Sequence, residues 1–328
     1  MKKKKFKWGI LGTANISKTI IDAIRLSGHD VYAIASRSSK KGIQFATEKN
    51  ITKTYSSYDE LLNDKVIDIV YIPLPNSEHY KWIKKSIIKK KHVLCEKPIC
   101  TNVKKIDDII SLSKKNKIIV SEALMYRHHP QIIKLKKIIK SNTIGKIKNF
   151  KGKFYYEINN KKNIRYEKKL DGGSLWDLGY YLISLINYIF SNDIAKISAQ
   201  IKETIKEVDS KFYGKILFKD NLLAELNSSF INKKNDSIEI IGTKGVIKIN
   251  SAFLRKKIKK ILIIKNNKKT LHTFKEDKHR YVYQIEDLID AINNVKKNEV
   301  SLAESKKNIY ISTLLLSSAY SKKEIYFN

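Results

Sequence analysis

The stretch Gly9-Ile10-Leu11-Gly12-Thr13-Ala14-Asn15-Ile16-Ser17 joins a short apolar run to an amphipathic one. Residues 8–11 have the pattern of a buried strand, and residues 16–26 have the period of a helix. A glycine at position 12 suits the tight turn between the two. We therefore expect the chain to begin with a strand that turns directly into a helix.

The alternation of strands and helices continues to about residue 124. It predicts a parallel, doubly wound sheet of the Rossmann type. Residues 67–72 support this prediction, because they show no polar alternation apart from Asp68 and therefore fit a strand covered on both faces. The expected strands are 8–11, 31–35, 67–72, 92–95 and 118–120, and the expected helices are 16–26, 39–49, 57–63, 77–88 and 103–113.

The pattern changes from about residue 145, where runs alternate between polar and apolar residues. Such runs predict an antiparallel sheet with one exposed face. We expect an α/β protein with two domains. Residues 1–124 would hold the Rossmann-like parallel sheet, and residues 125–328 would form an α+β domain with a large, mostly antiparallel open sheet. The last helix should pack back toward the first domain. The expected strands here are 146–157, 194–203, 211–218, 222–230, 237–241 and 246–249, and the expected helices are 173–190, 281–294 and 303–321.

The first strand–helix turn is a candidate phosphate loop. The dinucleotide fingerprint G-x-G-x-x-[GA] lets backbone N–H groups and a helix N-terminus hold a pyrophosphate. The match here is degenerate, with Gly12, Ala14 and Ser17 at the three positions, so a plain turn is the alternative. Its place in the first turn of an alternating domain favours a cofactor site. The residues assigned to it are Gly12, Thr13, Ala14, Asn15 and Ile16.

The end of the second expected strand bears on cofactor choice. A site selective for NAD usually has Asp or Glu here, bound to the ribose 2′-OH. This chain has Ser36 and Arg37 instead, with Lys41 shortly after. A hydroxyl and a guanidinium suit a 2′-phosphate, which favours NADP over NAD; a surface arginine in a turn is the alternative.

A lysine stands at the end of another expected strand, in Val93-Leu94-Cys95-Glu96-Lys97-Pro98. In open α/β sheets the ligand crevice lies outside the carboxyl ends of the strands. A lysine at that place can be desolvated and directed at a substrate. We therefore single out Lys97 among the many lysines of the chain.

The composition excludes some classes of function. The formal net charge is +34, yet only six residues are arginine, the side chain that nucleic-acid surfaces favour. Abundant Lys, Ile, Asn and Tyr fit an AT-rich genome, so no nucleic-acid partner is expected. The longest apolar run, 180–190, is too short to span a membrane. Two cysteines give neither a disulfide framework nor a metal site. We expect a cytoplasmic protein without a metal.

Five motifs together resemble one family. The chain is similar over nearly its whole length to the glucose–fructose oxidoreductase / inositol dehydrogenase family, Gfo/Idh/MocA. The resemblance implies a Rossmann domain, a second domain with an open sheet, bound NAD(P), and hydride exchange with a sugar or cyclitol carbon. It also implies a homodimer or homotetramer formed through the open sheet. The motifs are Gly9–Ser17, Ala35–Arg37, Pro75-Asn76-Ser77-Glu78-His79, Glu96-Lys97-Pro98 and Gly172–Tyr181.

The resemblance also implies roles for single residues. Lys97 would touch both the nicotinamide ribose and the substrate, with Pro98 shaping its turn as a cis peptide. Asp177 would be the aspartate of the Gly-Gly segment. Tyr181 stands where many members have histidine, which is similar to the branch with glucose–fructose oxidoreductase and dihydrodiol dehydrogenases. Pro75, Asn76 and His79 would lie beside the nicotinamide half of the cofactor. Pro73, Leu74 and Glu96 complete the residues assigned to the cofactor, and for Glu96 the alternative is a bond to the loop around the Lys97–Pro98 turn.

A chemical role can be reasoned for three of these side chains. Asp177 and Tyr181 are four apart on an expected helix and should share a face. The Lys97 ammonium would lower the pKa of Tyr181, so that the tyrosine serves as general base and acid. Lys97 would also stabilise an alkoxide, and Asp177 would orient the sugar hydroxyl or hold the lysine. The alternatives are core packing for Tyr181 and a helix-dipole role for Asp177.

Two further residues are candidates for substrate contact. Arg165 precedes the Gly-Gly turn, and a surface salt bridge is its alternative. Trp176 would offer a stacking surface for a sugar, with core packing as its alternative. The sequence thus predicts an NAD(P)-dependent oxidoreductase acting at a hydroxyl or carbonyl carbon of a sugar, sugar derivative or cyclic diol. A non-catalytic NADP-binding regulator and a glycoside-cleaving enzyme that retains NAD are the rival hypotheses.

Overall fold

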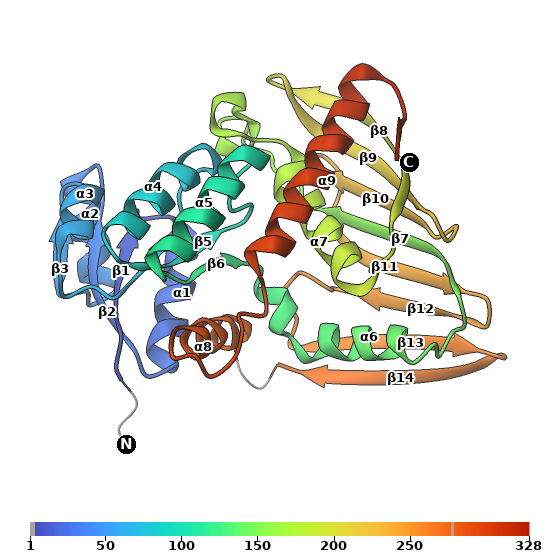
Figure 1. The fold of residues 1–328 in the computed structure, drawn as a ribbon, viewed down its shortest axis with the longest axis horizontal. Coiled ribbons are helices and arrows are strands. Elements are labelled where there is room, and N and C mark those ends of the chain that lie inside the picture. The colour runs from blue at the N-terminus through green and yellow to red at the C-terminus, as the bar shows by residue number, and fades with distance from the viewer. Residues whose placement is uncertain (1–3, 277–278, 328) are drawn as a thin grey trace. The chain divides into compact units, whose positions relative to one another are not determined.

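The computed structural model describes residues 4–276 and 279–327 (Figure 1). The chain forms two compact units that are discontinuous in sequence. The first unit includes the chain up to Met125 and a later segment that ends at Lys306; the second begins at Tyr126 and resumes at Lys307. The predicted division into residues 1–124 and 125–328 assigned that later segment to the second domain, and as a division by function it stays a prediction.

The first unit contains a sheet of six strands in the order β3-β2-β1-β4-β5-β6, and every neighbouring pair is parallel. This is the Rossmann strand order, and it confirms the predicted fold class. The strands are β1 (Lys7–Leu11), β2 (Asp30–Ala35), β3 (Lys53–Tyr55), β4 (Ile69–Ile72), β5 (His92–Glu96) and β6 (Val120–Ala123).

Helices cover this sheet, and polar caps fix where several of them begin. The Ser38 side chain accepts from the backbone N–H of Lys41, and Ser57 accepts from that of Glu60. Such caps satisfy N–H groups that have no partner inside the helix. The helices are α1 (Asn15–Leu26), α2 (Ser39–Glu48), α3 (Tyr58–Asn63), α4 (Asn76–Ile88), α5 (Val103–Asn116) and α8 (Arg280–Ile292).

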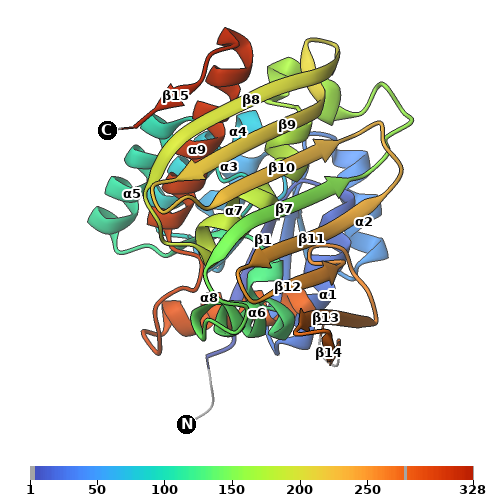
Figure 2. The same ribbon diagram turned by 90° about the vertical axis from the view of Figure 1, so that its right-hand side faces the viewer.

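The second unit contains a sheet of nine strands in the order β14-β13-β12-β11-β7-β10-β9-β8-β15 (Figure 2). All neighbours are antiparallel except β7 and β10, which confirms the mostly antiparallel prediction. The strands are β7 (Ile147–Tyr155), β8 (Ile194–Ile205), β9 (Val208–Phe218), β10 (Leu223–Ser229), β11 (Asn235–Gly242), β12 (Gly245–Asn250), β13 (Ile258–Lys265), β14 (Lys268–Lys275) and β15 (Ile325–Tyr326).

One face of the large sheet packs on helices and the other is open. Along β7, Phe150 and Phe154 are buried while Lys151 and Lys153 are exposed. Helix α7 (Tyr180–Ile189) lies behind the sheet in Figure 2 and approaches it closely. A Cβ at Gly152 would lie 2.6 Å from a Leu182 side-chain carbon, so glycine makes room for the helix. The other helical segments here are α6 (Pro130–Lys140) and the short turns Met125–His128, Ile164–Tyr166 and Lys168–Leu170.

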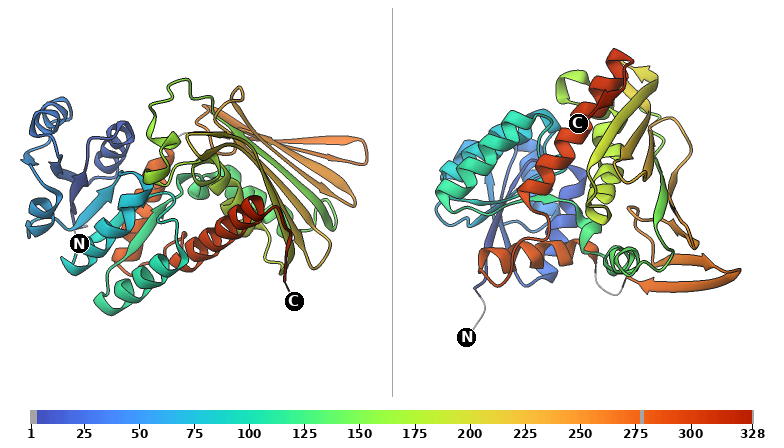
Figure 3. Two further views of the ribbon diagram at one scale, coloured as in Figure 1. Left: turned by 90° about the horizontal axis from the view of Figure 1, so that it is seen from above. Right: turned by 45° about the vertical axis from the view of Figure 1, so that its right-hand side comes forward.

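Helix α9 (Leu302–Ser321) belongs to both units and is unbroken (Figure 3). Near its start, within the first unit, the Ser305 hydroxyl donates to Glu122 over 2.7 Å. Near its end, within the second unit, the Ser318 hydroxyl accepts from the backbone N–H of Ala199 over 3.1 Å. Among the residues that the structure describes, no helix is long and apolar enough to cross a membrane.

Candidate active site

A hollow of about 310 Å³ opens at the carboxyl ends of β1, β2 and β4 in the first unit. Its wall includes eight of the residues that the sequence assigned to the cofactor, and it adds Ser38 and Tyr58. Three separate strand–loop junctions therefore converge on one place, as the Rossmann fold requires. The lining residues are Gly12, Thr13, Ala14, Ser36, Arg37, Ser38, Lys41, Tyr58, Pro73 and Leu74.

The first loop of the hollow depends on glycine. Gly12 has φ +109°, and a Cβ there would lie 3.1 Å from a Leu74 side-chain carbon. Its backbone N–H bonds to the carbonyl of Ala35 over 2.8 Å, which ties the ends of β1 and β2 together. Helix α1 then begins after Ala14, which provides no side-chain cap, and its first turn carries no acid. Uncapped N–H groups at a helix N-terminus are suited to a pyrophosphate.

The second loop supplies positive charge. Ser36 is buried, while Arg37 and Lys41 are exposed at the hollow. Burial raises the pKa of Tyr58, and the nearby Arg37 guanidinium opposes that rise. The Tyr58 ring packs edge-on against Trp82 with centroids 4.8 Å apart, so the hydroxyl beside Arg37 has a fixed support. Nothing in the sequence pattern identified Tyr58 as a residue of the hollow, because an aromatic side chain in the first turn of a helix is usually interpreted as a core residue.

His79 is fully buried, and its ring bridges the backbone of two loops. Its Nδ1 lies 2.8 Å from the Pro98 carbonyl oxygen, and its Nε2 lies 2.7 Å from that of Leu74. An imidazolium donates to both oxygens, whereas a neutral ring donates to one. His79 thus fixes Leu74, a wall of the hollow, against the turn after β5. The predicted direct contact of His79 with a cofactor stays a prediction.

The turn that carries Lys97 is fixed by hydrogen bonds of the residues on either side of it. The Lys97–Pro98 bond is cis, as expected. Glu96 accepts from the Tyr71 hydroxyl over 2.7 Å, and the backbone N–H of Ile99 bonds to the fully buried Glu122 over 2.8 Å. Lys97 itself is half-buried. Asn15, Ile16, Asn76, Glu96 and Lys97 are not among the residues that line the hollow, so their cofactor roles stay predictions.

In the second unit the Gly-Gly segment differs from the expected helix 173–190. Residues Leu175–Gly179 form a π-helical turn, in which the backbone N–H of Tyr180 bonds to the carbonyl of Leu175 five residues earlier. Regular α-helix begins only at Tyr180. The regular α-helix expected over 173–190 was therefore wrong for residues 175–179, and the shared face of Asp177 and Tyr181 stays a prediction. Such turns occur frequently at functional sites.

Arg165 and Asp177 form an ion pair. The Arg165 Nε lies 2.7 Å from Asp177 Oδ2, and the side chains are 45% and 18% exposed, respectively. The salt bridge that the sequence left open for Arg165 is present, and its partner is the predicted catalytic aspartate. The pair keeps Asp177 oriented while leaving part of the guanidinium accessible. Trp176 is buried with its ring centroid 6.3 Å from that of Tyr180, as its core alternative described.

Tyr181 lies in a group of four aromatic rings. Its ring centroid is 5.7 Å from that of Tyr126, 5.5 Å from Phe154 and 5.3 Å from Phe253. Only 8% of the residue is exposed, so the ring orientation is fixed by packing. Lys97 belongs to the first unit, and Asp177 and Tyr181 belong to the second. The predicted pairing of the Lys97 ammonium with the Tyr181 phenol stays a prediction.

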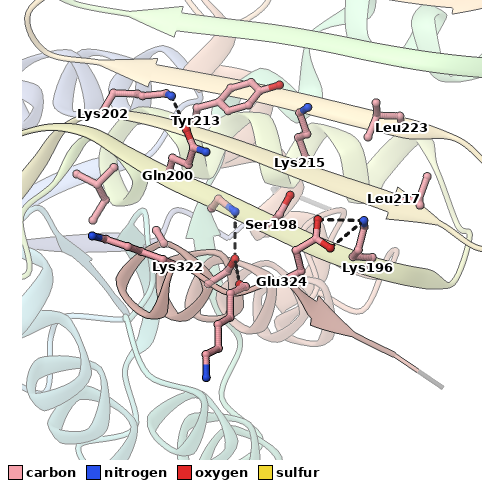
Figure 4. A pocket seen from close by; sticks show the side chains of 15 residues that line it. Lys196, Ser198, Gln200, Lys202, Tyr213, Lys215, Leu217, Leu223, Lys322 and Glu324 are labelled. Carbon is pink, nitrogen blue, oxygen red and sulfur yellow. Dashed lines mark hydrogen bonds and ion pairs between the residues drawn. The ribbon is translucent and has the colours of Figure 1, made fainter.

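A larger hollow, of about 810 Å³, lies on the outer face of the large sheet (Figure 4). Strands β8, β9 and β10 form its floor, and the end of α9 with the following residues 322–324 forms one side. Lysines surround it, and one of them, Lys196, pairs with Glu324 over 3.0 Å. It contains none of the residues predicted for cofactor, substrate or catalysis, so its size alone does not mark a reaction centre.

Comparison with known proteins matches both halves of the chain. Residues 6–124 match the model of an oxidoreductase family with an NAD-binding Rossmann fold, and residues 132–248 match the GFO/IDH/MocA C-terminal domain. The chain is 31% identical over 249 residues to D-xylose 1-dehydrogenase (NADP(+)) 2 of Haloferax volcanii, covering 75% of this chain and 76% of that protein.

Two other proteins show the same likeness. The chain is 30% identical over 250 residues to trans-1,2-dihydrobenzene-1,2-diol dehydrogenase of Xenopus tropicalis, covering 75% of each chain. Its fold matches the crystal structure of aldose-aldose oxidoreductase from Caulobacter crescentus with a TM-score of 0.90, at 20% identity and 99% and 100% coverage. With both domain models matched and the Rossmann hollow in place, the chain belongs to the Gfo/Idh/MocA oxidoreductase family.

Proposed function

We propose that this oxidoreductase uses NADP to exchange a hydride with a hydroxyl- or carbonyl-bearing carbon of a sugar, a sugar derivative or a cyclic diol. The observation that carries the proposal is the hollow at the strand ends, which brings together the phosphate loop and the Ser36-Arg37 turn in a member of an NAD-binding family. Nicotinamide supplies the hydride chemistry when it is bound. The residues of this chain bind it, orient the substrate and move the proton.

The preference for NADP rests on charge at the second loop. The lining of the hollow contains Arg37 and Lys41 and no carboxylate. A 2′-phosphate would find a guanidinium, an ammonium and the N-terminus of α2, each favourable for an anion. A site built for NAD would present an acid to the 2′-OH. The name of the Haloferax relative, an NADP(+) enzyme, points the same way.

The proton and the developing charge need side chains of their own. We assign Tyr181 as the acid and base for the substrate hydroxyl, because its ring is held rigidly by packing and an ammonium beside it would favour the phenolate. Lys97 would supply that ammonium and stabilise the alkoxide. Asp177, held by Arg165, would fix a neighbouring hydroxyl of the substrate.

The substrate class rests on the relatives. Their names give an aldopentose, D-xylose, and a ring diol, dihydrobenzenediol. Both carry a secondary or anomeric hydroxyl next to another hydroxyl, which suits two adjacent recognition groups such as Tyr181 and the Arg165–Asp177 pair. Trp176 is kept as a candidate substrate contact, although its buried ring favours packing.

The test is an assay of NADP and NAD reduction with a panel of aldoses, nucleotide sugars, cyclitols and dihydrodiols. Formation of reduced nicotinamide with a panel member supports a dehydrogenase. Sugar release without net cofactor turnover would instead support the glycoside-cleaving alternative, and cofactor binding without any turnover would support the regulator.

A variant pair then tests the mechanism. Lys97→Ala should abolish turnover while leaving NADP binding largely intact, whereas Lys89→Ala, at an exposed lysine after α4, should leave both unchanged. Full activity in Lys97→Ala would overturn the assignment. We also propose a cytoplasmic location. We further propose a homodimer or homotetramer formed through the open face of the large sheet, and light scattering of the purified protein would measure that oligomeric state.

A further inference from the structure

A buried carboxylate in the second unit reaches the segment that carries Asp177. Asp209 is the second residue of β9 and is 3% exposed. Its Oδ2 accepts from the Ser174 hydroxyl over 2.7 Å and from the backbone N–H of Leu175, also over 2.7 Å. These donors are at the start of the π-helical turn, where N–H groups have no partner inside the helix. Asp209 therefore caps this turn from another element of the fold.

The backbone before the turn is shaped around the same carboxylate. Gly173 has φ +117°, and a Cβ there would lie 2.3 Å from Asp209 Oδ1. Only glycine lets the chain pass so close to the carboxylate in this conformation. Ser174 Oγ also lies 3.0 Å from Ser228 Oγ on β10, so two neighbouring strands hold the segment.

The contacts continue from Gly173 to the predicted reaction centre. The backbone N–H of Gly173 bonds to the Arg165 carbonyl over 2.9 Å, and the N–H of Asp177 bonds to the Gly173 carbonyl over 3.1 Å. The Arg165 side chain then returns to the Asp177 carboxylate. Asp209 is thus linked to Asp177 through Ser174 and the adjoining Gly173, and the three bonds among Gly173, Arg165 and Asp177 close a loop.

We propose that Asp209 is a positioning residue of the active site: by holding Gly173, Ser174 and Leu175 it sets where Asp177 and Arg165 stand. The inference rests on the proposed function, because it assigns Asp177 a part in turnover. Burial raises the pKa of Asp209 to about 6, while its bonds to Ser174 and Leu175 oppose that rise. Burying a carboxylate costs free energy. In return, this carboxylate is a strong hydrogen-bond acceptor for two donors that converge on it.

The test compares substitutions at two buried carboxylates. Asp209→Ala removes the acceptor, Asp209→Asn keeps one carbonyl oxygen, and Ser174→Ala removes one donor. The matched control is Asp287→Asn in the first unit, where the carboxylate is also 3% exposed and accepts from the backbone N–H of Glu299 over 2.9 Å. Each variant is assayed with NADP and the best substrate of the panel for kcat and for both KM values.

We expect Asp209→Ala to lower kcat by roughly 10–100-fold, the size of a misplaced catalytic geometry, with KM for NADP within about twofold of the unaltered enzyme. Asp209→Asn should recover part of the loss, and Ser174→Ala should show a smaller loss. Asp287→Asn should leave kcat unchanged. A kcat for Asp209→Ala equal to that of Asp287→Asn would overturn the inference, as would equal losses in kcat and in affinity for NADP.

A second readout needs no activity. Amide hydrogen exchange of residues 173–181, in protein without cofactor or substrate, should quicken in Asp209→Asn and not in Asp287→Asn. Unchanged exchange there would overturn the positioning role. If the unaltered protein shows no turnover with the whole panel, the proposed function fails, and the exchange result still decides what Asp209 holds.

Discussion

The hollow of the first unit and the Gly172–Tyr181 segment of the second unit are built in opposite ways. The hollow consists of loops that each follow a strand end, so its residues stand close to the sequence signals that predict those strands. The segment is fixed by Asp209 and by the rings of Phe154 and Phe253, which are far from it in sequence. Fold topology thus places the residues of the hollow, and side-chain packing places the residues of the segment.

The two regions also differ in burial. Arg37 and Lys41 of the hollow are exposed, whereas Asp209 and Tyr181 are buried. We therefore expect substitutions of the exposed residues Arg37 and Lys41 to change cofactor affinity without changing stability, and substitutions around the segment to change stability, turnover or both. Four experiments test this contrast.

The largest effect is expected from Tyr181→Phe, which removes the hydroxyl and keeps the ring. Loss of general acid–base catalysis should reduce kcat by on the order of 10²–10⁴-fold. The free energy of unfolding should change little, because the three ring contacts remain. Tyr126→Phe is the control: its hydroxyl donates to Ser184 over 2.8 Å, so it should lose about 1 kcal/mol of stability. Unimpaired kcat in Tyr181→Phe would make Tyr181 a core residue only.

Gly173→Ala should produce the largest loss of stability. The new Cβ would meet Asp209 Oδ1 in a backbone conformation that alanine rarely adopts, so unfolding should require about 2–4 kcal/mol less free energy. Gly28→Ala is the matched control, since Gly28 has φ +80° with nothing within 4 Å of a Cβ. Gly28→Ala should lower the free energy of unfolding by only about 1 kcal/mol, because its positive φ is strained for alanine but its Cβ meets no other atom. If urea unfolding gave the same loss of unfolding free energy for both variants, the Asp209 side chain would have moved aside at little cost.

Arg37→Ala should lower the affinity for NADP without changing stability. Loss of a charge-assisted bond to the 2′-phosphate should raise the KM for NADP by roughly 10–100-fold and leave the KM for NAD nearly unchanged. The melting temperature should stay the same, because Arg37 is exposed. A parallel rise in both KM values would show that Arg37 contacts the adenine half without reading the phosphate.

The smallest effect concerns pH. Burial raises the folded-state pKa of Asp209 to about 6, above the unfolded value of about 3.9, so the folded state binds the proton more tightly. This group therefore opposes folding above pH 6, and the opposition fades as pH falls from 6 to 4. Relative to Asp209→Asn, the unaltered protein should gain on the order of 1–2 kcal/mol in unfolding free energy between pH 7 and pH 4.5. A constant difference would show that Asp209 titrates as an ordinary carboxylate.

Much of the first unit followed from local signals. The run Ile69–Ile72 is fully buried, as continuous apolar sequence predicts, and Ser57 caps α3 as expected. The candidate cofactor residues could be chosen because parallel strands all end at one edge of the sheet. Strand β3 was missed because Lys53-Thr54-Tyr55 is short and largely exposed, and β13 and β14 because their lysines hide the alternation.

The Gly172–Tyr181 segment of the second unit could not be predicted in the same way. The pattern of residues 173–190 is apolar enough for a helix, but nothing in it tells an α-turn from a π-turn. The role of Asp209 depends on pairing across β9 and β10, which sequence spacing does not reveal. Tyr58 is a similar case, because its place in the hollow beside Arg37 depends on a tertiary contact that sequence spacing does not reveal.

The π-helical turn Leu175–Gly179 has a consequence for insertions and deletions. It contains one residue more than regular helix requires, so deleting a single residue would let ordinary i→i−4 bonds run from Ser174 into α7. The helix would become more regular, and the residues on either side could keep their register, because the wide turn is what absorbs the extra residue. The residues inside the turn would change position, and Asp177 would shift relative to Arg165, with which it now pairs over 2.7 Å. A one-residue deletion at this point would thus exchange the Arg165–Asp177 geometry for helical regularity.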